Sequence, residues 1–263
     1  MNIKERFELS DSFLLGHCIS PKPTEFICGM ELEIEQVRDF NEHWMEENCV
    51  QVETDGSLRN DGREFLLCPA RLEQNLALFK ELHKCAVDLG PEAFSQRTST
   101  HVHVNVMYSE LYQVKNLLLL YSIFEELFFN FVGEERKNNI HCVPLSYTHM
   151  SRYYGGAIDL LRSRWHKYTA FNILPLNEKG TVEFRHLEGT KDHVRVEEWL
   201  KLIKLLWITA HTRSSLCGND LMDITWLKEL TAQIMTPAFC RQCVVPPTFV
   251  VEKNLIDVKL AFL

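Results

Sequence analysis

GMELEIE, residues 29–35, places a glutamate at every second position from Glu31 onward, with apolar residues between them. In a β-strand this period of two puts the carboxylates on one face and the apolar side chains on the other. Carboxylates that follow one another on a face lie roughly 7 Å apart, which is repulsive unless positive charge lies among them. The segment therefore predicts a strand with one buried face and one acidic face that requires a cation.

Three further segments alternate in the same way, with an apolar face opposite a face that carries ionisable or amide side chains. The residues on those faces are Glu64 in 61–69, His101, His103 and Asn105 in 99–106, and Glu183 and Arg185 in 180–190. Any solvated sheet face is polar, but these residues are Glu, His, Asn and Arg with almost no lysine. We therefore expect the four strands to share one functional face.

The remaining periodicity predicts an α+β fold in one domain, residues 1–263. Antiparallel or mixed pairing is favoured because short turns, such as Asn60-Asp61-Gly62, join neighbouring strands. The helices are expected to stack on one face of the sheet. Predicted strands cover 26–35, 49–54, 62–68, 99–107, 168–174 and 180–187; predicted helices cover 72–89, 109–132 with Ser109 as N-cap, a segment from Asp192 through 211, and 223–235.

Net charge, the longest apolar run and the cysteine content disfavour several classes of protein. The formal net charge of −8 argues against binding a nucleic-acid duplex through a broad basic surface. The longest apolar run, 117–132, is shorter than a membrane span and contains Glu125 and Glu126. Nine irregularly spaced cysteines and a charged start predict a reduced, cytoplasmic chain. Cys240 and Cys243 have zinc or redox spacing, but no second pair exists, which favours two reduced thiols.

The ionisable residues also indicate a kind of chemistry. Carboxylates with an imidazole suit Mg²⁺ or Mn²⁺, and magnesium in proteins keeps phosphate oxygens among its ligands. An arginine beside such a site complements the charge of a transferring phosphoryl group. No GxxxxGK[ST] and no GxSxG motif is present. The pattern therefore favours metal–polyphosphate chemistry outside the P-loop class.

Five motifs in this order resemble the amidoligase family of the glutamine synthetase and glutamate–cysteine ligase superfamily, over roughly residues 26–200. They are GMELEIE, DGSL followed by GREFLLCP, THVHVNV, RWHKYTAFNI and TVEFRHLEGT. The resemblance implies a curved antiparallel sheet with helices on its convex face and ATP and divalent metals on its concave face. It also implies ATP-dependent joining of a carboxylate to an amine through an acyl phosphate. Residues 215–263 match no part of this pattern.

The resemblance also implies roles for single residues. Glu35 receives none and is interpreted as a support for the site or as an exposed residue. The implied metal ligands are Glu31, Glu33, Glu64, Glu183 and His101; His103 is implied to lie near the ATP phosphates, and Arg185 to contact the γ-phosphoryl group.

Two sets of residues keep alternative interpretations. Asp55 resembles an aspartate that helps to deprotonate the amine, but here DGS follows the GMELEIE strand instead of preceding it, and a tight Asp-Gly turn is an equal alternative. Arg152, Arg164, Lys167 and Asn172 are candidates for phosphate or substrate carboxylate binding, with surface ion pairs as the alternative for the first three. Loop 133–163 either covers the site or is an ordered surface loop.

The sequence thus predicts an ATP- and Mg²⁺- or Mn²⁺-dependent carboxylate–amine ligase. The expected partners are small-molecule or peptide carboxylates and amines, with neither nucleic acid nor membrane. A phosphotransferase of the guanido kinase type and a non-catalytic nucleotide-binding protein are the alternatives. The identity of the two substrates and the oligomeric state stay open.

Overall fold

A computed structural model describes residues 1–10, 24–148, 162, 165–213, 216 and 223–247 of the chain. The helices are α1 (Ile3–Phe7), α3 (Glu42–Glu47), α4 (Leu72–Glu81), α5 (Leu111–Val132), α6 (Glu134–Lys137), α8 (His193–Thr212), α9 (Ile224–Ile234) and α10 (Pro237–Gln242). The strands are β1 (Cys28–Ile34), β2 (Val37–Phe40), β3 (Val50–Glu53), β4 (Arg63–Ala70), β5 (Val87–Leu89), β6 (Ser99–Asn105), β7 (Phe171–Asn172) and β8 (Thr181–Glu188). No described helix unites the length and the hydropathy of a membrane crossing.

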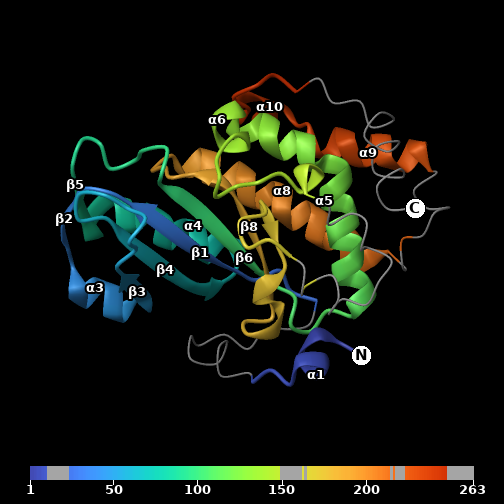
Figure 1. The fold of residues 1–263 in the computed structure, drawn as a ribbon, viewed down its shortest axis with the longest axis horizontal. Helices are drawn as coiled ribbons and strands as arrows, with labels where there is room; N and C mark the ends of the chain where they lie inside the picture. The colour runs from blue at the N-terminus through green and yellow to red at the C-terminus, as the bar shows by residue number, and fades with distance from the viewer. Residues whose placement is uncertain (11–23, 149–161, 163–164, 214–215, 217–222, 248–263) are drawn as a thin grey trace.

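The six predicted strands are the six strands of one antiparallel sheet, in the order β3-β4-β1-β6-β8-β7. Strand β1, which contains most of GMELEIE, lies between β4 and β6 in the middle of this sheet (Figure 1). The predicted α+β class with antiparallel pairing is therefore confirmed. A second, two-stranded sheet pairs β2 with β5 and was not predicted.

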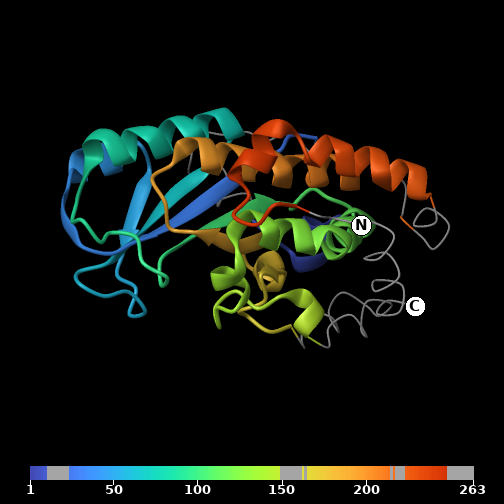
Figure 2. The ribbon, with the colours of Figure 1, turned by 90° about the horizontal axis from the view of Figure 1, so that it is seen from above.

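The apolar face of the sheet is covered by helices. Figure 2 shows α4 and α8 along one side of the sheet, and α5 packs against α8 and the neighbouring strand β8. Met30 and Leu32 of β1 are 1% and 2% exposed, so the apolar half of the alternation is buried as expected. Phe128 of α5 stacks on Phe184 of β8 at 5.6 Å and meets Trp199 of α8 edge-on at 5.2 Å. This aromatic contact joins the helices to the sheet and leaves the opposite face for the charged residues.

Two predicted helix boundaries differ from the structure. The helix predicted over 72–89 ends at Glu81, continues as one π-helical turn, and gives way to β5, whose backbone hydrogen bonds are made with β2. The apolar stripe runs on through the turn, so side-chain period alone does not reveal the change. Helix α5 takes Glu110 as its N-cap instead of Ser109, because the Ser109 hydroxyl bonds His211 Nε2 at 2.7 Å. The predicted start at Asp192 is confirmed for α8.

Candidate functional site

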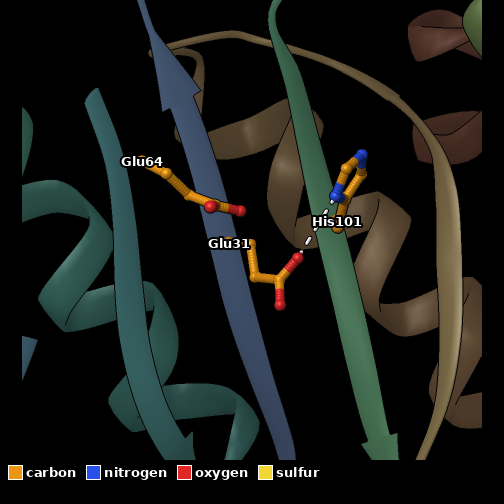
Figure 3. Close-up of side chains that lie close together, drawn as sticks. All are labelled: Glu31, Glu64 and His101. Atoms are coloured by element: carbon orange, nitrogen blue, oxygen red, sulfur yellow. Dashed lines mark hydrogen bonds and ion pairs between the residues drawn. The ribbon is translucent and has the colours of Figure 1, made fainter. Parts of the chain in front are cut away.

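The charged residues of four strands meet on the face of the sheet that α4 and α8 leave uncovered. Strand register places Glu31 of β1 directly opposite His101 of β6, and places His103 opposite Glu183 of β8. Figure 3 shows the side chains of Glu64, Glu31 and His101, from three adjacent strands, turned toward one another. The alternation predicted from sequence thus brings residues far apart in the chain into one cluster.

Glu31 lies at the centre of this cluster. Its Oε1 is 2.9 Å from His103 Nε2 and its Oε2 is 3.3 Å from His101 Nδ1. Lys179, just before β8, brings its Nζ to 3.4 Å from the same Oε1. Burial raises the pKa of Glu31, but attraction and hydrogen bonds from the two imidazoles outweigh burial and hold that pKa well below its ordinary value. Glu31 is therefore a carboxylate at neutral pH.

Glu183 is the second buried carboxylate, with its Oε1 at 3.4 Å from His101 Nδ1. Asn172 Nδ2 donates to its Oε2 at 2.8 Å, and the Arg185 guanidinium donates to its Oε1. Burial raises the pKa of Glu183, but the attraction of His103, His101 and Arg185 has the larger effect. The pKa of Glu183 is therefore below its ordinary value, and the group stays ionised. Arg185 and Asn172, two predicted ligand-binding residues, therefore contact a predicted metal ligand directly.

Two groups of three side chains present donor atoms that all lie within 4.8 Å of one another: Glu31 with Glu64 and His101, and Glu31 with His103 and Glu183. Both groups offer two carboxylate oxygens and one imidazole nitrogen, a donor set that suits Mg²⁺ or Mn²⁺. Burial raises the pKa of Glu64 to about 8, and Glu31 and Glu33 add repulsion. A divalent cation among these carboxylates would relieve that repulsion, so the donor set fits a metal.

The hydrogen bonds of the two histidines support the same interpretation. The Ser99 hydroxyl donates to Glu33 and lies 2.8 Å from His101 Nε2, while Nδ1 of the same ring faces the carboxylates of Glu31 and Glu183. His103 Nδ1 lies 3.0 Å from the Thr181 hydroxyl. Its Nε2 is buried and lies 2.9 Å from Glu31 Oε1. In both rings one nitrogen is held by a hydroxyl and the other faces carboxylates, an arrangement that suits metal ligands.

Three cavities surround the cluster. One of about 440 Å³ is lined by Glu31, Glu64 and His103 together with apolar residues such as Leu66 and Pro69. A larger one of about 890 Å³ is lined by two acids and five cations, namely Glu33, Asp55, Arg59, Arg97, Arg136, Lys167 and Arg185. A third, of about 480 Å³, is lined by Asn172 and Lys179 and shares Lys167 and Arg185 with the second. Arg185 therefore lies where two cavities meet, next to the carboxylate cluster.

The remaining predicted residues fall in different places. Glu33 belongs to neither group of three donors and faces the larger cavity. Asp55 lines that cavity as well, and its Oδ1 accepts the backbone N–H of Ser57 at 2.7 Å; its catalytic role stays a prediction. Glu35 is 4% exposed and accepts the backbone N–H of Arg59 at 2.9 Å; its alternative as an exposed residue was therefore wrong. Arg152 and Arg164 lie outside the described residues.

Several residues near the site were not predicted from sequence. Ser99 and Thr181 are the first residues of β6 and β8 and share the alternation of His101 and Glu183, whereas Lys179 precedes β8 and is identified only by its contact with Glu31. Arg136 of α6 is 5% exposed and donates to the backbone carbonyls of His186 and Arg185, both at 2.7 Å. Nothing in its GEERK segment distinguishes this arginine from a surface residue.

A comparison with family models agrees with the motifs. The model described as "putative amidoligase enzyme" matches residues 66–207, more than half of the 263 residues. The match includes His101, His103, Glu183 and Arg185 and begins after Glu31 and Glu64. No match is found among curated proteins. The chain belongs to the amidoligase family.

Proposed function

We propose that this protein is an ATP- and divalent-metal-dependent ligase that joins a carboxylate to an amine, on a sheet of the glutamine synthetase type. The observation that carries the proposal is the pair of donor groups that share Glu31, border the smaller cavity and, through Glu183, contact Arg185 on the wall of the larger one. A single metal site would suit many hydrolases. Two adjacent sites with an arginine at their edge suit the transfer of a phosphoryl group.

Each donor group would hold one ion, the first through Glu31, Glu64 and His101 and the second through Glu31, His103 and Glu183. The bound ions would neutralise the carboxylates and the phosphates of the nucleotide. This assignment moves His103 from a phosphate contact to a metal ligand. Glu33 would act through Ser99, which fixes the His101 ring with Nδ1 toward the ion.

ATP, when bound, supplies the phosphoryl group that turns the acid's carboxylate into an acyl phosphate. We place the nucleotide in the smaller cavity, because both donor groups reach it through Glu31 and because its remaining wall is mostly apolar. Arg185, which contacts Glu183 and lines the other two cavities, would stabilise the charge that develops on the transferring phosphoryl group. Asp55, on the wall of the larger cavity, would take the proton of the amine as its nitrogen attacks the acyl carbon and inorganic phosphate leaves to give the amide.

The test is release of ADP with mixtures of acids and amines. The proposal expects ADP only when both substrates are present, and an amide as the product. Glu31→Ala and Glu183→Ala should each abolish turnover, and unchanged activity in both variants would contradict the metal assignment. A stable phosphorylated product would instead identify a phosphotransferase, and tight ATP binding without turnover would identify a binding protein. Glu47→Ala is the matched control, because Glu47 is exposed on α3 and pairs only with His43 among the described residues.

A further inference from the structure

The larger cavity concentrates positive charge in a chain whose net charge is −8. Five cationic side chains line it against two carboxylates, Glu33 and Asp55; the cations are Arg59, Arg97, Arg136, Lys167 and Arg185. Glu33 is already engaged with Ser99, and Asp55 with the backbone of its own turn. The wall therefore carries an excess of positive charge that the protein's own acids do not neutralise.

Three of these cations are exposed and have no carboxylate partner among the residues that the structure describes: Arg59, Arg97 and Lys167. Arg97 donates to the backbone carbonyl of Ser57 at 3.0 Å, which holds its guanidinium beside the loop that carries Asp55. The Lys167 ammonium lies 4.6 Å from the centre of the Tyr168 ring. Both contacts fix the position of a positive charge without neutralising it.

These cations come from separate parts of the chain. Arg59 lies between β3 and β4, Arg97 precedes β6, and Lys167 precedes β7. They converge on one cavity that Arg185 also lines, and Arg185 in turn contacts Glu183 of the carboxylate cluster. Lys167 and Arg185 also line the adjoining third cavity, so the positive wall extends past the larger one. An anion with several separated charges fits this arrangement better than a compact one.

Resting on the proposed ligase function, we propose that the acid substrate is an acidic peptide, which carries carboxylates in addition to the one that reacts. The reacting carboxylate would lie at Arg185, and the others at Arg59, Arg97 and Lys167. A volume of about 890 Å³ is at the upper end of ligand pockets and exceeds the needs of one amino acid. The nucleotide lies elsewhere, because the metal donor groups open on the smaller cavity.

Binding of a fluorescent peptide of three glutamates to the full chain, followed by anisotropy, tests the proposal directly. We expect affinity that falls steeply between about 50 and 300 mM salt, and at least about tenfold weaker binding of the matching glutamine peptide. The double variant Arg59→Glu with Arg97→Glu should weaken peptide binding by at least about tenfold and leave ATP binding unchanged. Arg38→Glu is the matched control, since Arg38 is exposed on β2 and lines none of the three cavities.

Several outcomes would overturn the proposal. They are equal affinity for the glutamate and glutamine peptides, retained peptide binding in the double variant, and loss of ATP binding in place of peptide binding. Turnover separates this proposal from the ligase function on which it rests. Faster ADP release with acids that carry no charge besides the reacting carboxylate than with acidic peptides would retain the ligase function and contradict the acidic-peptide substrate. Selective peptide binding without ADP release for any amine would keep the acidic-peptide site and reject the ligase.

Discussion

Glu31 Oε1 lies 2.9 Å from His103 Nε2, across the boundary between strands β1 and β6. The other oxygen of the same carboxylate lies 3.3 Å from His101, so Glu31 bridges the two histidines of THVHVNV. Glu31 is also the one residue common to both groups of metal donors that the described residues form. Its removal should therefore affect the site more than the removal of any other single carboxylate.

Glu31→Gln should remove both metal sites, whereas Glu64→Gln should remove one. Each group keeps a carboxylate and an imidazole without Glu31, but it loses the carboxylate that the two groups have in common. Titration of Mn²⁺ by electron paramagnetic resonance counts the bound ions: two for the wild type, none for Glu31→Gln and one for Glu64→Gln. Two bound ions in Glu31→Gln would show that the ions use other ligands.

Thr181→Val should weaken metal binding although Thr181 contacts no proposed metal. Its hydroxyl lies 3.0 Å from His103 Nδ1 and fixes which ring nitrogen faces Glu31. Loss of such a contact lowers metal affinity by about tenfold to a hundredfold. Isothermal titration of the variant with Mn²⁺ measures the change, and Thr181→Ser, which restores the hydroxyl, should recover the affinity. An affinity of Thr181→Val equal to that of the wild type would reject the role of Thr181.

The stability of the metal-free protein should fall as the pH rises toward 8. Burial, with repulsion from Glu31 and Glu33, raises the folded-state pKa of Glu64 to about 8 from 4.5. The folded protein therefore holds this proton more tightly than the unfolded chain does. The resulting stabilisation is complete below the pKa of the group in the unfolded chain and is lost as the pH rises through its pKa in the folded protein. Melting temperatures at about pH 6 and about pH 9, with and without Mn²⁺, check this.

In Glu64→Gln the contribution of this group to the pH slope should disappear, because glutamine does not titrate. In the wild type, Mn²⁺ should restore stability at high pH and release a proton on binding near neutral pH, since the ion binds the ionised carboxylate. An identical pH slope in wild type and variant would contradict the raised pKa.

Arg136→Met should destabilise the fold by about 2–4 kcal/mol, because it leaves the buried carbonyls of His186 and Arg185 without their donor. Urea unfolding measures the change in the free energy of unfolding. The neighbouring Lys137→Met is the control: among the described residues Lys137 pairs only with Glu134 of its own helix, at 3.8 Å, so this substitution should change stability by less than about 0.5 kcal/mol. Equal effects of the two substitutions would show that the two carbonyl contacts add nothing.

The local pattern determined much of this fold. A period of two in 29–35, 99–106 and 180–190 fixes which side chains share a face, because pleating alternates them whatever the strand's partners are. All six predicted strands appear in the sheet, and the apolar face is buried under helices. The same alternation assigned Glu31, Glu64, His101, His103 and Glu183 to the functional face before any contact was known.

Tertiary structure decided which of these residues meet. The placement of β1 between β4 and β6 puts Glu31 within reach of Glu64 and both histidines and directs Glu33 to the other cavity. The end of α4 and the start of β5 depend on the pairing of β5 with β2, which lies about fifty residues earlier in the chain. The convergence of Arg59, Arg97 and Lys167 is likewise non-local. The alternation of side chains along a strand follows from the local backbone alone. The order in which strands pair depends on how the whole sheet is buried against its helices.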